Sequence, residues 1–474
     1  MTLGTGDWIV IAVYVGIVAA ITIWHTAKTT TTSEFLLAGR RLTLPIFVAT
    51  LVSTWYGGIF GISEFTEYYG LGAWLVQGIF WYIIYAVFAL FIAEKIRSMP
   101  FYTIPDILEN NYGKKAAFVG GIFTYIMVNP APYLLSLGIL IAYFSPLTLV
   151  ESIIISTCLC IIYTYLAGFR GVVYTDLFQF MWMFLAFIVL FYLAYNEWGG
   201  IEFLQKNLPE THLQITGGMS TGVILVWAGL ACWVFVDPNF YQRCAAAKNP
   251  KTAKHGILTC IAFWLVFDIV AIGSAMYGFA ALSAGELSIP PGNNKYMYLA
   301  LADHLMSSPL KGLFVAGIVS TIMSTADSFL FVAAVNISRD YYWRYLNREA
   351  SDEKVVVATR IAILITAVFS AALAIALPKV TQLWYALGNI GLSALLISML
   401  RTFYGKKHGG HAALASMFAG AAVACLWLLF GLIHMKNGFP VYPLGVEPLY
   451  PGLLLSYLAY EISGRLSHES NSKK

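Results

Sequence analysis

A run of hydroxyl and carboxyl side chains lies inside an apolar stretch of the sequence that is long enough to cross a lipid bilayer. The run reads Ser320-Thr321-Ile322-Met323-Ser324-Thr325-Ala326-Asp327-Ser328. Lipid offers such groups no hydrogen-bond partners, so they must face other protein, water or an ion. The hydroxyls that share one helical face, by spacings of three and four residues, are those of Thr321, Ser324, Thr325 and Ser328. Small hard cations prefer oxygen ligands, so this stripe is a candidate ion site.

The composition places the stripe in a polytopic membrane protein. Of the 474 residues, 59% are hydrophobic and only 11% are charged, whereas soluble domains carry about 25% charged residues. Soluble enzyme classes are therefore excluded, and scattered histidines without a nucleophile–base pair predict that the chain is not an enzyme. The net charge of +4 fits contact with the inner leaflet, and no nucleic acid partner is expected.

About thirteen apolar segments are long enough to span a bilayer. They lie near residues 7–25, 44–69, 72–94, 117–144, 150–168, 172–196, 221–240, 257–282, 312–335, 356–377, 381–400, 411–434 and 447–463. Placing the N-terminus outside and the C-terminus inside puts most Lys and Arg, Arg243 among them, on the cytoplasmic side, as the positive-inside rule requires. The first segment has no cleavage site and is expected to be retained. The sequence thus predicts a multi-pass protein of the cell (inner) membrane.

Two of these segments contain helix-breaking residues near their middle. The second holds Gly57-Gly58 followed by Gly61, and the fourth holds Asn129-Pro130-Ala131-Pro132-Tyr133. Discontinuous helices expose backbone carbonyls, which secondary transporters use to bind ions and substrates. Close packing of helices through small residues explains the glycines equally well, so both interpretations stay open.

Four stretches together resemble the sodium:solute symporter family. The polar stripe is followed by Asn336-Ile337-Ser338-Arg339-Asp340-Tyr341-Tyr342, which is similar to the end of the family's signature helix. The other three stretches are Thr54-Trp55-Tyr56-Gly57-Gly58, Gly168-Phe169-Arg170-Gly171-Val172-Val173-Tyr174-Thr175-Asp176 and Asp237-Pro238-Asn239-Phe240-Tyr241-Gln242-Arg243, the last continued by Ala245-Ala246-Ala247-Lys248. They occur in the family's order, and the resemblance covers roughly residues 1–465.

The resemblance implies an all-α polytopic membrane protein with a LeuT-type fold of five-plus-five inverted repeats. Residues 1–43 would then form an extra transmembrane helix and an inner loop. Residues 44–400 would form the transporter core, with repeats at 44–196 and 221–400. Residues 401–474 would add two transmembrane helices and a short cytoplasmic tail.

The resemblance also implies sodium sites. The main site would use the backbone carbonyls of Ser53, Tyr56 and Thr321 with the hydroxyls of Ser324 and Thr325. A possible second sodium site would use Asp176, Asp327 and Ser328. Neutral oxygens bind sodium weakly enough to release it, as transport requires.

The residues expected to contact the solute, which is taken to be a small organic molecule, surround the two breaks. They are Trp55, Gly57, Phe60, Asn129, Tyr133 and Trp227, with packing as the competing interpretation for the aromatic ones. The chain lacks the acid and serine of proline carriers near Trp55 and the arginine of sialic acid carriers near Asn129. Asp268, in the middle of an apolar segment, is either a structural hydrogen-bond acceptor or part of a polar path.

These observations predict a sodium-coupled secondary transporter that imports a small organic solute by alternating access across the lipid bilayer. A transporter-like solute sensor or receptor is one alternative. A proton-coupled symporter is the other, because Asp327 and Asp268 are intramembrane carboxyl groups.

Overall fold

A computed structural model describes the chain except for residues 27–36, 102, 291, 406–407, 437–438 and 473–474. Most of the predicted inner loop after the first helix, and the end of the predicted tail, therefore lie outside the described residues. The described part is almost entirely helical. This agrees with the predicted all-α class, because a backbone within lipid must satisfy its own hydrogen bonds.

The first half of the chain contains α1 (Thr5–Thr26), η1 (Ala38–Arg40), α3 (Leu44–Ser53), α4 (Ile59–Tyr69), α5 (Gly72–Trp74), η2 (Leu75–Ile79), α6 (Phe80–Phe88), η3 (Ala89–Ala93), α7 (Glu94–Ser98), α8 (Ile104–Tyr112), α9 (Lys114–Met127), α10 (Ala131–Phe144), α11 (Leu149–Trp198), α12 (Ile201–Asn207), η4 (Glu210–Leu213), α13 (Thr221–Leu230), η5 (Ala231–Val236) and α14 (Pro238–Ala246).

The second half contains α15 (Pro250–Ser283), η6 (Asn294–Tyr296), α16 (Met297–Leu305), α17 (Leu310–Val335), η7 (Asn336–Leu346), α18 (Asp352–Ala376), α19 (Val380–Phe403), α20 (Gly410–Ile433), the strands β1 (Met435–Lys436) and β2 (Phe439–Pro440), η8 (Pro443–Gly445) and α21 (Leu449–Ser472). The two strands pair antiparallel, with Met435 opposite Pro440.

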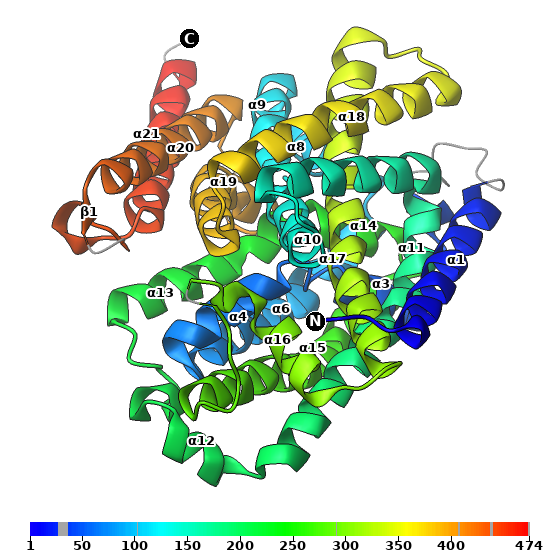
Figure 1. Cartoon of the computed structure of the whole chain (residues 1–474). Coiled ribbons are helices and arrows are strands. Elements are labelled where there is room, and N and C mark those ends of the chain that lie inside the picture. Colours follow the sequence, from blue (N-terminus) through cyan, green and yellow to red (C-terminus); the bar gives the residue numbers. More distant parts are fainter. Residues whose placement is uncertain (27–36, 102, 291, 406–407, 437–438, 473–474) are drawn as a thin grey trace.

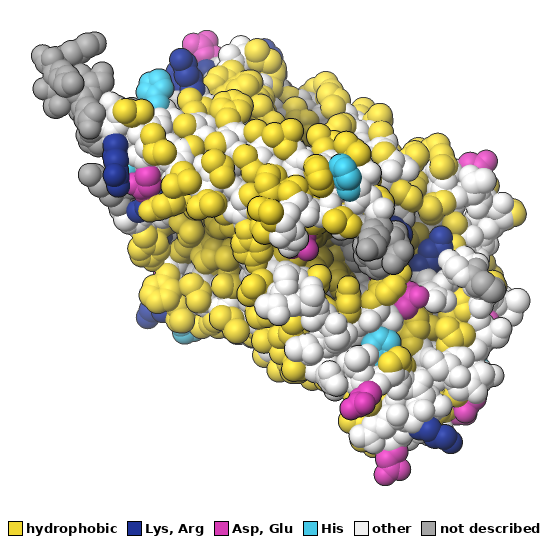
Figure 2. All heavy atoms as spheres, turned by 90° about the vertical axis from the view of Figure 1, so that its left-hand side faces the viewer, with side chains coloured by type: hydrophobic (Ala, Val, Ile, Leu, Met, Phe, Trp, Pro, Cys, Tyr) yellow, Lys and Arg dark blue, Asp and Glu magenta, His cyan; other side chains and the backbone are white. Residues whose placement is uncertain are grey.

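Each of the thirteen apolar segments lies in a helix or in a broken helix, and the segments 150–168 and 172–196 share α11, whose helical backbone is interrupted at Gly168. Within the described residues, ten helices are long and apolar enough to cross a membrane, or eleven if the bent pair Thr221–Val236 and Pro238–Ala246 counts as one span. Figure 2 shows a broad band of hydrophobic side chains on one face, with charged side chains mostly toward its two ends. Such a band is what contact with lipid hydrocarbon requires.

The helix breaks predicted from glycine and proline are present. Helix α3 ends at Ser53 and α4 begins at Ile59, so the Gly57-Gly58 pair lies in the gap. Helix α9 ends at Met127 and α10 begins at Ala131. Glycine permits such interruptions because it has no side chain to restrict its backbone, and proline enforces them because it cannot donate a helical hydrogen bond.

Helix α17, which carries the polar stripe, lies at the centre of the molecule (Figure 1). Helix α17 begins the 37-residue span from Leu310 to Leu346. In the most apolar 18-residue stretch of this span, 89% of the residues are buried. Helix α1 packs against α11 and α17, whereas α20 and α21 pack against each other and α19. The first helix and the last two therefore flank the central bundle on different sides (Figure 1).

Candidate functional site

The polar stripe of α17 meets the broken helix at the freed carbonyl of Ser53. The Ser324 hydroxyl lies 2.9 Å from this carbonyl and 2.8 Å from the carbonyl of Ser320, and the Thr325 hydroxyl approaches the Ser53 carbonyl at 3.2 Å. Ser53, Ser324 and Thr325 are fully buried. The carbonyl is available because α3 ends at Ser53, and the chain then turns before α4 begins.

The same hydroxyls remain within reach of their own helix. Ser324 and Thr325 each lie 3.4 Å from the carbonyl oxygen of Thr321. Four of the five residues expected at the main sodium site are thus in mutual contact. The fifth, Tyr56, lies in the break itself, and its phenol donates to Asp268 at 2.8 Å.

Glycine at position 57 allows this close contact. A Cβ atom there would lie 2.4 Å from the Cβ atom of Thr325 and 2.8 Å from the ring of Tyr133. The Gly57 N–H donates to the Thr325 hydroxyl at 2.9 Å. Glycine here therefore serves both as a helix break and as a site of close packing, which were the two interpretations open from the sequence.

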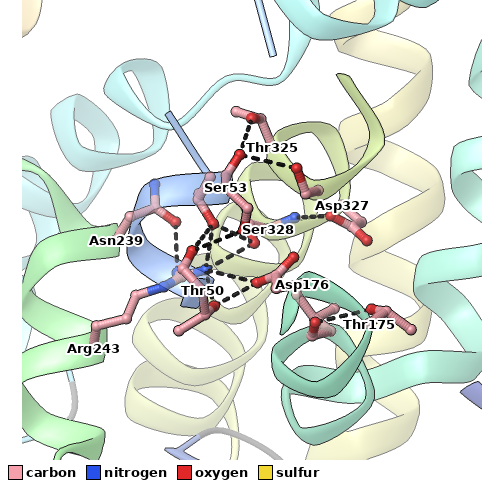
Figure 3. Close-up of polar contacts among 12 residues, drawn as sticks. Thr50, Ser53, Thr175, Asp176, Asn239, Arg243, Thr325, Asp327 and Ser328 are labelled. Carbon is pink, nitrogen blue, oxygen red and sulfur yellow. Dashed lines mark hydrogen bonds and ion pairs between the residues drawn. The ribbon is translucent and has the colours of Figure 1, made fainter. Parts of the chain in front are cut away.

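A second, charged cluster lies beside the first and centres on the guanidinium of Arg243 (Figure 3). Its Nη2 atom donates to the hydroxyls of Ser328 at 2.8 Å and Thr54 at 3.0 Å, and its Nη1 atom donates to Asn239 at 3.1 Å. Nη2 also lies 3.8 Å from a carboxylate oxygen of Asp176. Arg243 is fully buried, and a buried charge needs such a set of partners.

The charged cluster contains all three residues expected at the second sodium site. Asp176 accepts a hydrogen bond from the Thr50 hydroxyl and pairs with Arg243. Asp327 accepts the backbone N–H of Ser328 at 2.8 Å. The residues therefore come together as expected, but two of them, Asp176 and Ser328, already contact a cation of the protein itself.

Arg243 is expected on the cytoplasmic side from the sequence, and the structure shows that its side chain is buried within the protein. Asp237 separates η5 from α14, which begins at Pro238, and the chain bends there by 40°. Helix α14 then packs against both α3 and α17. Arg243 consequently points into the protein.

A cavity lies next to the helix break. Its empty volume is about 640 Å³, counting space open to solvent. It is lined by Trp55, Tyr56, Ile62, Gln77, Trp81, Tyr133, Trp227, Leu230, Trp233, Asp237, Asp268, Phe329 and Trp384. A concave space of this size that is mostly apolar, with a few polar groups, is typical of a small-molecule site.

The cavity contains half of the expected solute contacts. Trp55, Tyr133 and Trp227 line it, whereas Gly57, Phe60 and Asn129 are absent from the lining. Phe60 is fully buried in the core. The Asn129 side chain accepts the N–H of Ala131 at 3.0 Å, within the break before α10.

Asp268 has the structural role of a hydrogen-bond acceptor, which was one of the two interpretations open from the sequence. It accepts hydrogen bonds from the phenols of Tyr56 and Tyr82, and it lines the cavity. The lining residues that sequence reasoning missed include Gln77, Trp81, Asp237 and Trp384. Asp237 had a signal, because an acid directly before proline marks a helix start, but the others occur in continuous apolar segments without a distinctive pattern.

Comparisons with known proteins identify the family of the chain. A model of the sodium:solute symporter family matches residues 35–420. The osmoregulated proline transporter OpuE of Bacillus subtilis is 26% identical over 314 residues, which are 64% of this chain and 61% of that protein. High-affinity choline transporter 1 of Drosophila melanogaster is 24% identical over 451 residues, covering 88% of this chain and 68% of that protein.

Solved structures match the fold. A Na+-coupled sialic acid symporter, in a substrate-bound outward-open state, superposes with a TM-score of 0.78 over 98% of both chains at 15% identity. Mhp1 in an inward-facing conformation gives a TM-score of 0.50 at 15% identity, covering 90% of this chain and 91% of that one. The chain therefore has a LeuT-like fold.

The family match settles the class of the protein. It is a transporter rather than an enzyme, and sodium is an ion that it moves together with a solute rather than a resident cofactor. Its relatives include sodium/proline symporters, such as that of Escherichia coli, 24% identical over 60% of this chain and 58% of that protein. The chain belongs to the sodium:solute symporter family and is a multi-pass membrane protein that couples solute transport to sodium.

Proposed function

We propose that the transported sodium ion binds between α3 and α17, at the carbonyls of Ser53 and Thr321 and the hydroxyls of Ser324 and Thr325, with the carbonyl of Tyr56 as a fifth ligand. The observation that carries this proposal is the convergence of both hydroxyls on the Ser53 carbonyl at the helix break. A hydroxyl both donates and accepts. The two groups can therefore turn their lone pairs toward an ion without any rearrangement of the backbone.

The chemistry of this cluster suits an ion that must bind and leave. Its oxygens are neutral and belong to buried residues. Sodium is a hard cation that such oxygens coordinate, and modest affinity favours release. Because the cluster joins a broken helix to α17, occupation of the site holds the two helices together, which is how an ion can bias an alternating-access equilibrium.

For the second site, we propose that Arg243 supplies the positive charge that Asp176 and Ser328 bind. The guanidinium contacts both residues. A sodium ion among the same oxygens would meet repulsion from this resident cation, which costs several kcal/mol at short range in a partly buried site, on the order of 4 kcal/mol at 4 Å. In this proposal Asp327 belongs to the charged cluster and is not a sodium ligand. One sodium ion therefore moves per cycle.

The proposed topology follows the sequence expectation. The chain crosses the bilayer thirteen times, with the N-terminus outside and the C-terminus inside. Residues 1–43 contribute the first helix and an inner loop, 44–196 and 221–400 form the inverted repeats, and 401–474 add the last two helices and a tail. Support comes from the helix α1 and the pair α20 and α21, which flank the central bundle.

Uptake into proteoliposomes tests the proposal. An inward sodium gradient should accelerate solute uptake over an equal potassium gradient, across a panel of amino acids, quaternary amines, sugars and carboxylates. The membrane potential at which net flux vanishes should fit one sodium ion per solute. Flux driven by a proton gradient in sodium-free buffer would favour the proton-coupled alternative. Solute binding without any uptake would favour the sensor.

A further inference from the structure

The cavity beside the helix break has walls built mainly from aromatic rings. Five tryptophans line it: Trp55, Trp81, Trp227, Trp233 and Trp384. The rings of Trp55 and Trp81 lie 4.7 Å apart in an edge-to-face arrangement. Aromatic faces are electron-rich, so several rings around one space attract a cation rather than an anion.

Glycines in the neighbouring helices make room for two of these rings. A Cβ atom on Gly58 would lie 2.0 Å from the ring of Trp384, and one on Gly388 would lie 2.8 Å from the ring of Trp233. Both tryptophans therefore pack directly against backbone. The aromatic wall is fixed by the fold and does not depend on adjustable surface side chains.

The ionisable side chains of Asp, Glu, Lys, Arg or His type that line the cavity are all acidic among the described residues. Its carboxyl groups are those of Asp237 and Asp268, and no described residue of the lining is Lys, Arg or His. An anionic solute, or the carboxylate of an amino acid, would find no basic side chain there. A cationic solute would find two acids, and a charge held in a largely apolar space needs an opposite charge nearby.

Asp237 interacts electrostatically with Arg243 but keeps one carboxylate oxygen that can accept a hydrogen bond from a solute. Its Oδ1 atom accepts the N–H of Asn239 at 2.8 Å, and among the described residues no hydrogen bond involves its Oδ2 atom. Asp237 is only 2% exposed, and it lines the cavity. Asp268 differs, because both of its oxygens accept phenol hydrogen bonds from Tyr56 and Tyr82.

Gln77 adds a polar group at the cavity wall. Its Nε2 atom is buried and has no hydrogen-bond partner within the described part of the chain. An unpaired amide N–H at a cavity wall can donate a hydrogen bond to a hydroxyl or carbonyl oxygen of a solute. The cavity therefore offers an aromatic enclosure, one free carboxylate oxygen and one free amide donor.

We infer that the transported solute is a small organic cation with an alkylated ammonium group, held between the tryptophan rings and paired with Asp237. This inference rests on the proposed transport function and names its substrate class. Alkyl groups on the nitrogen match the apolar ring faces, and the positive charge is shared by the rings and the carboxylate. A hydroxyl at the other end of the solute fits the free amide of Gln77.

Competition in proteoliposomes tests the inference. Radiolabelled choline is the probe, and the competitors are tetramethylammonium, L-proline and the uncharged isostere of choline in which carbon replaces nitrogen. We expect sodium-stimulated choline uptake that tetramethylammonium inhibits. The uncharged isostere should inhibit this uptake at least about tenfold more weakly. Sodium-driven uptake of proline that tetramethylammonium does not affect would overturn the inference and leave sodium coupling intact. Equal inhibition by the isostere would also overturn it.

Tryptophan fluorescence separates binding from coupling. Saturable quenching of the purified protein by tetramethylammonium, without sodium-stimulated uptake of any solute, would support the cation site and overturn the coupling. Absence of both would overturn both proposals.

Two substitutions test whether the cationic solute binds in this cavity. Asp237→Asn keeps an oxygen that accepts the Asn239 N–H and removes the charge, so it should raise the half-saturating choline concentration about tenfold and leave the sodium requirement unchanged. Trp55→Leu should have a similar effect. The matched control is Trp8→Leu, because Trp8 is 58% exposed on α1, away from the cavity. Unchanged choline affinity in a well-folded Asp237→Asn protein would overturn the inference.

Discussion

Two polar clusters lie side by side where α3 meets α17, and they differ in charge. The first contains only neutral oxygens, and its hydroxyls of Ser324 and Thr325 converge on the carbonyl of Ser53. The second contains Asp176 and the guanidinium of Arg243. Both clusters are buried. The second cluster thus contains a cation of the protein itself, Arg243 of α14, whereas the first cluster contains none.

This difference suggests that the two clusters have different functions. A buried carboxylate with a resident partner is a fixed structural element, because breaking the pair leaves an uncompensated charge. A neutral oxygen cluster costs less when empty, because its hydroxyls donate to nearby carbonyls until an ion arrives. We therefore expect the charged cluster to determine stability and the neutral cluster to determine the response to sodium.

The largest expected effect comes from Arg243→Met. The change leaves Asp176 buried without its cation, so the protein should lose about 3–5 kcal/mol of stability. Thermal unfolding in detergent should shift downward equally in sodium and in potassium. The companion variant Arg243→Met with Asp176→Asn removes both charges and should recover much of the loss. A single variant as stable as the unmodified protein would contradict the structural role of the pair.

Gly57→Ala should disturb the neutral cluster by steric overlap. The added Cβ would press on Thr325 and Tyr133, and overpacking of this kind costs about 1–3 kcal/mol. We expect a lower melting temperature together with weaker sodium stimulation of uptake. Gly16→Ala is the control, since nothing lies within 4 Å of a Cβ at Gly16. Equal behaviour of the two variants would show that close packing at the break is not required.

The double change Ser324→Ala with Thr325→Ala addresses the ion more directly. Loss of two ligands should raise the sodium concentration for half-maximal uptake by about tenfold or more, which is about 1.4 kcal/mol. Because a ligand stabilises the state that binds it, the extra thermal stability in sodium over potassium should also disappear. The control is Ser274→Ala, whose hydroxyl donates only along its own helix, to Val270. An unchanged sodium requirement would remove the proposed site.

Thr50→Val should have the smallest effect. It removes a hydroxyl that donates to Asp176 but leaves the ion pair with Arg243 in place. Loss of one such hydrogen bond costs about 1–3 kcal/mol when the partner is buried, and we expect the lower end because Asp176 keeps Arg243. The half-maximal sodium concentration should not change. A clear rise in that concentration would mean that the two clusters act as one ion site.

Much of the neutral cluster could be predicted because its signals are local. The hydroxyl spacing in α17 follows directly from helical geometry, and Gly57-Gly58 marks a break that requires no knowledge of neighbours. The charged cluster was harder to predict. Residues such as Asp176 and Ser328 were assigned through family resemblance, but nothing in the sequence around Arg243 indicates that its side chain turns inward at the bend after Asp237.

The sequence alone determined the membrane class, the thirteen apolar segments and the positions of the helix breaks, because hydrophobicity, periodicity and backbone restriction are properties of short stretches. Only the tertiary structure decided which faces meet. It brought Gln77 and Trp81 of one membrane span together with the distant residues Asp237 and Trp384 at one cavity, and it buried the side chain of Arg243 fully within the protein. Contacts of this kind depend on how helices pack across more than a hundred residues of sequence, which no local pattern records.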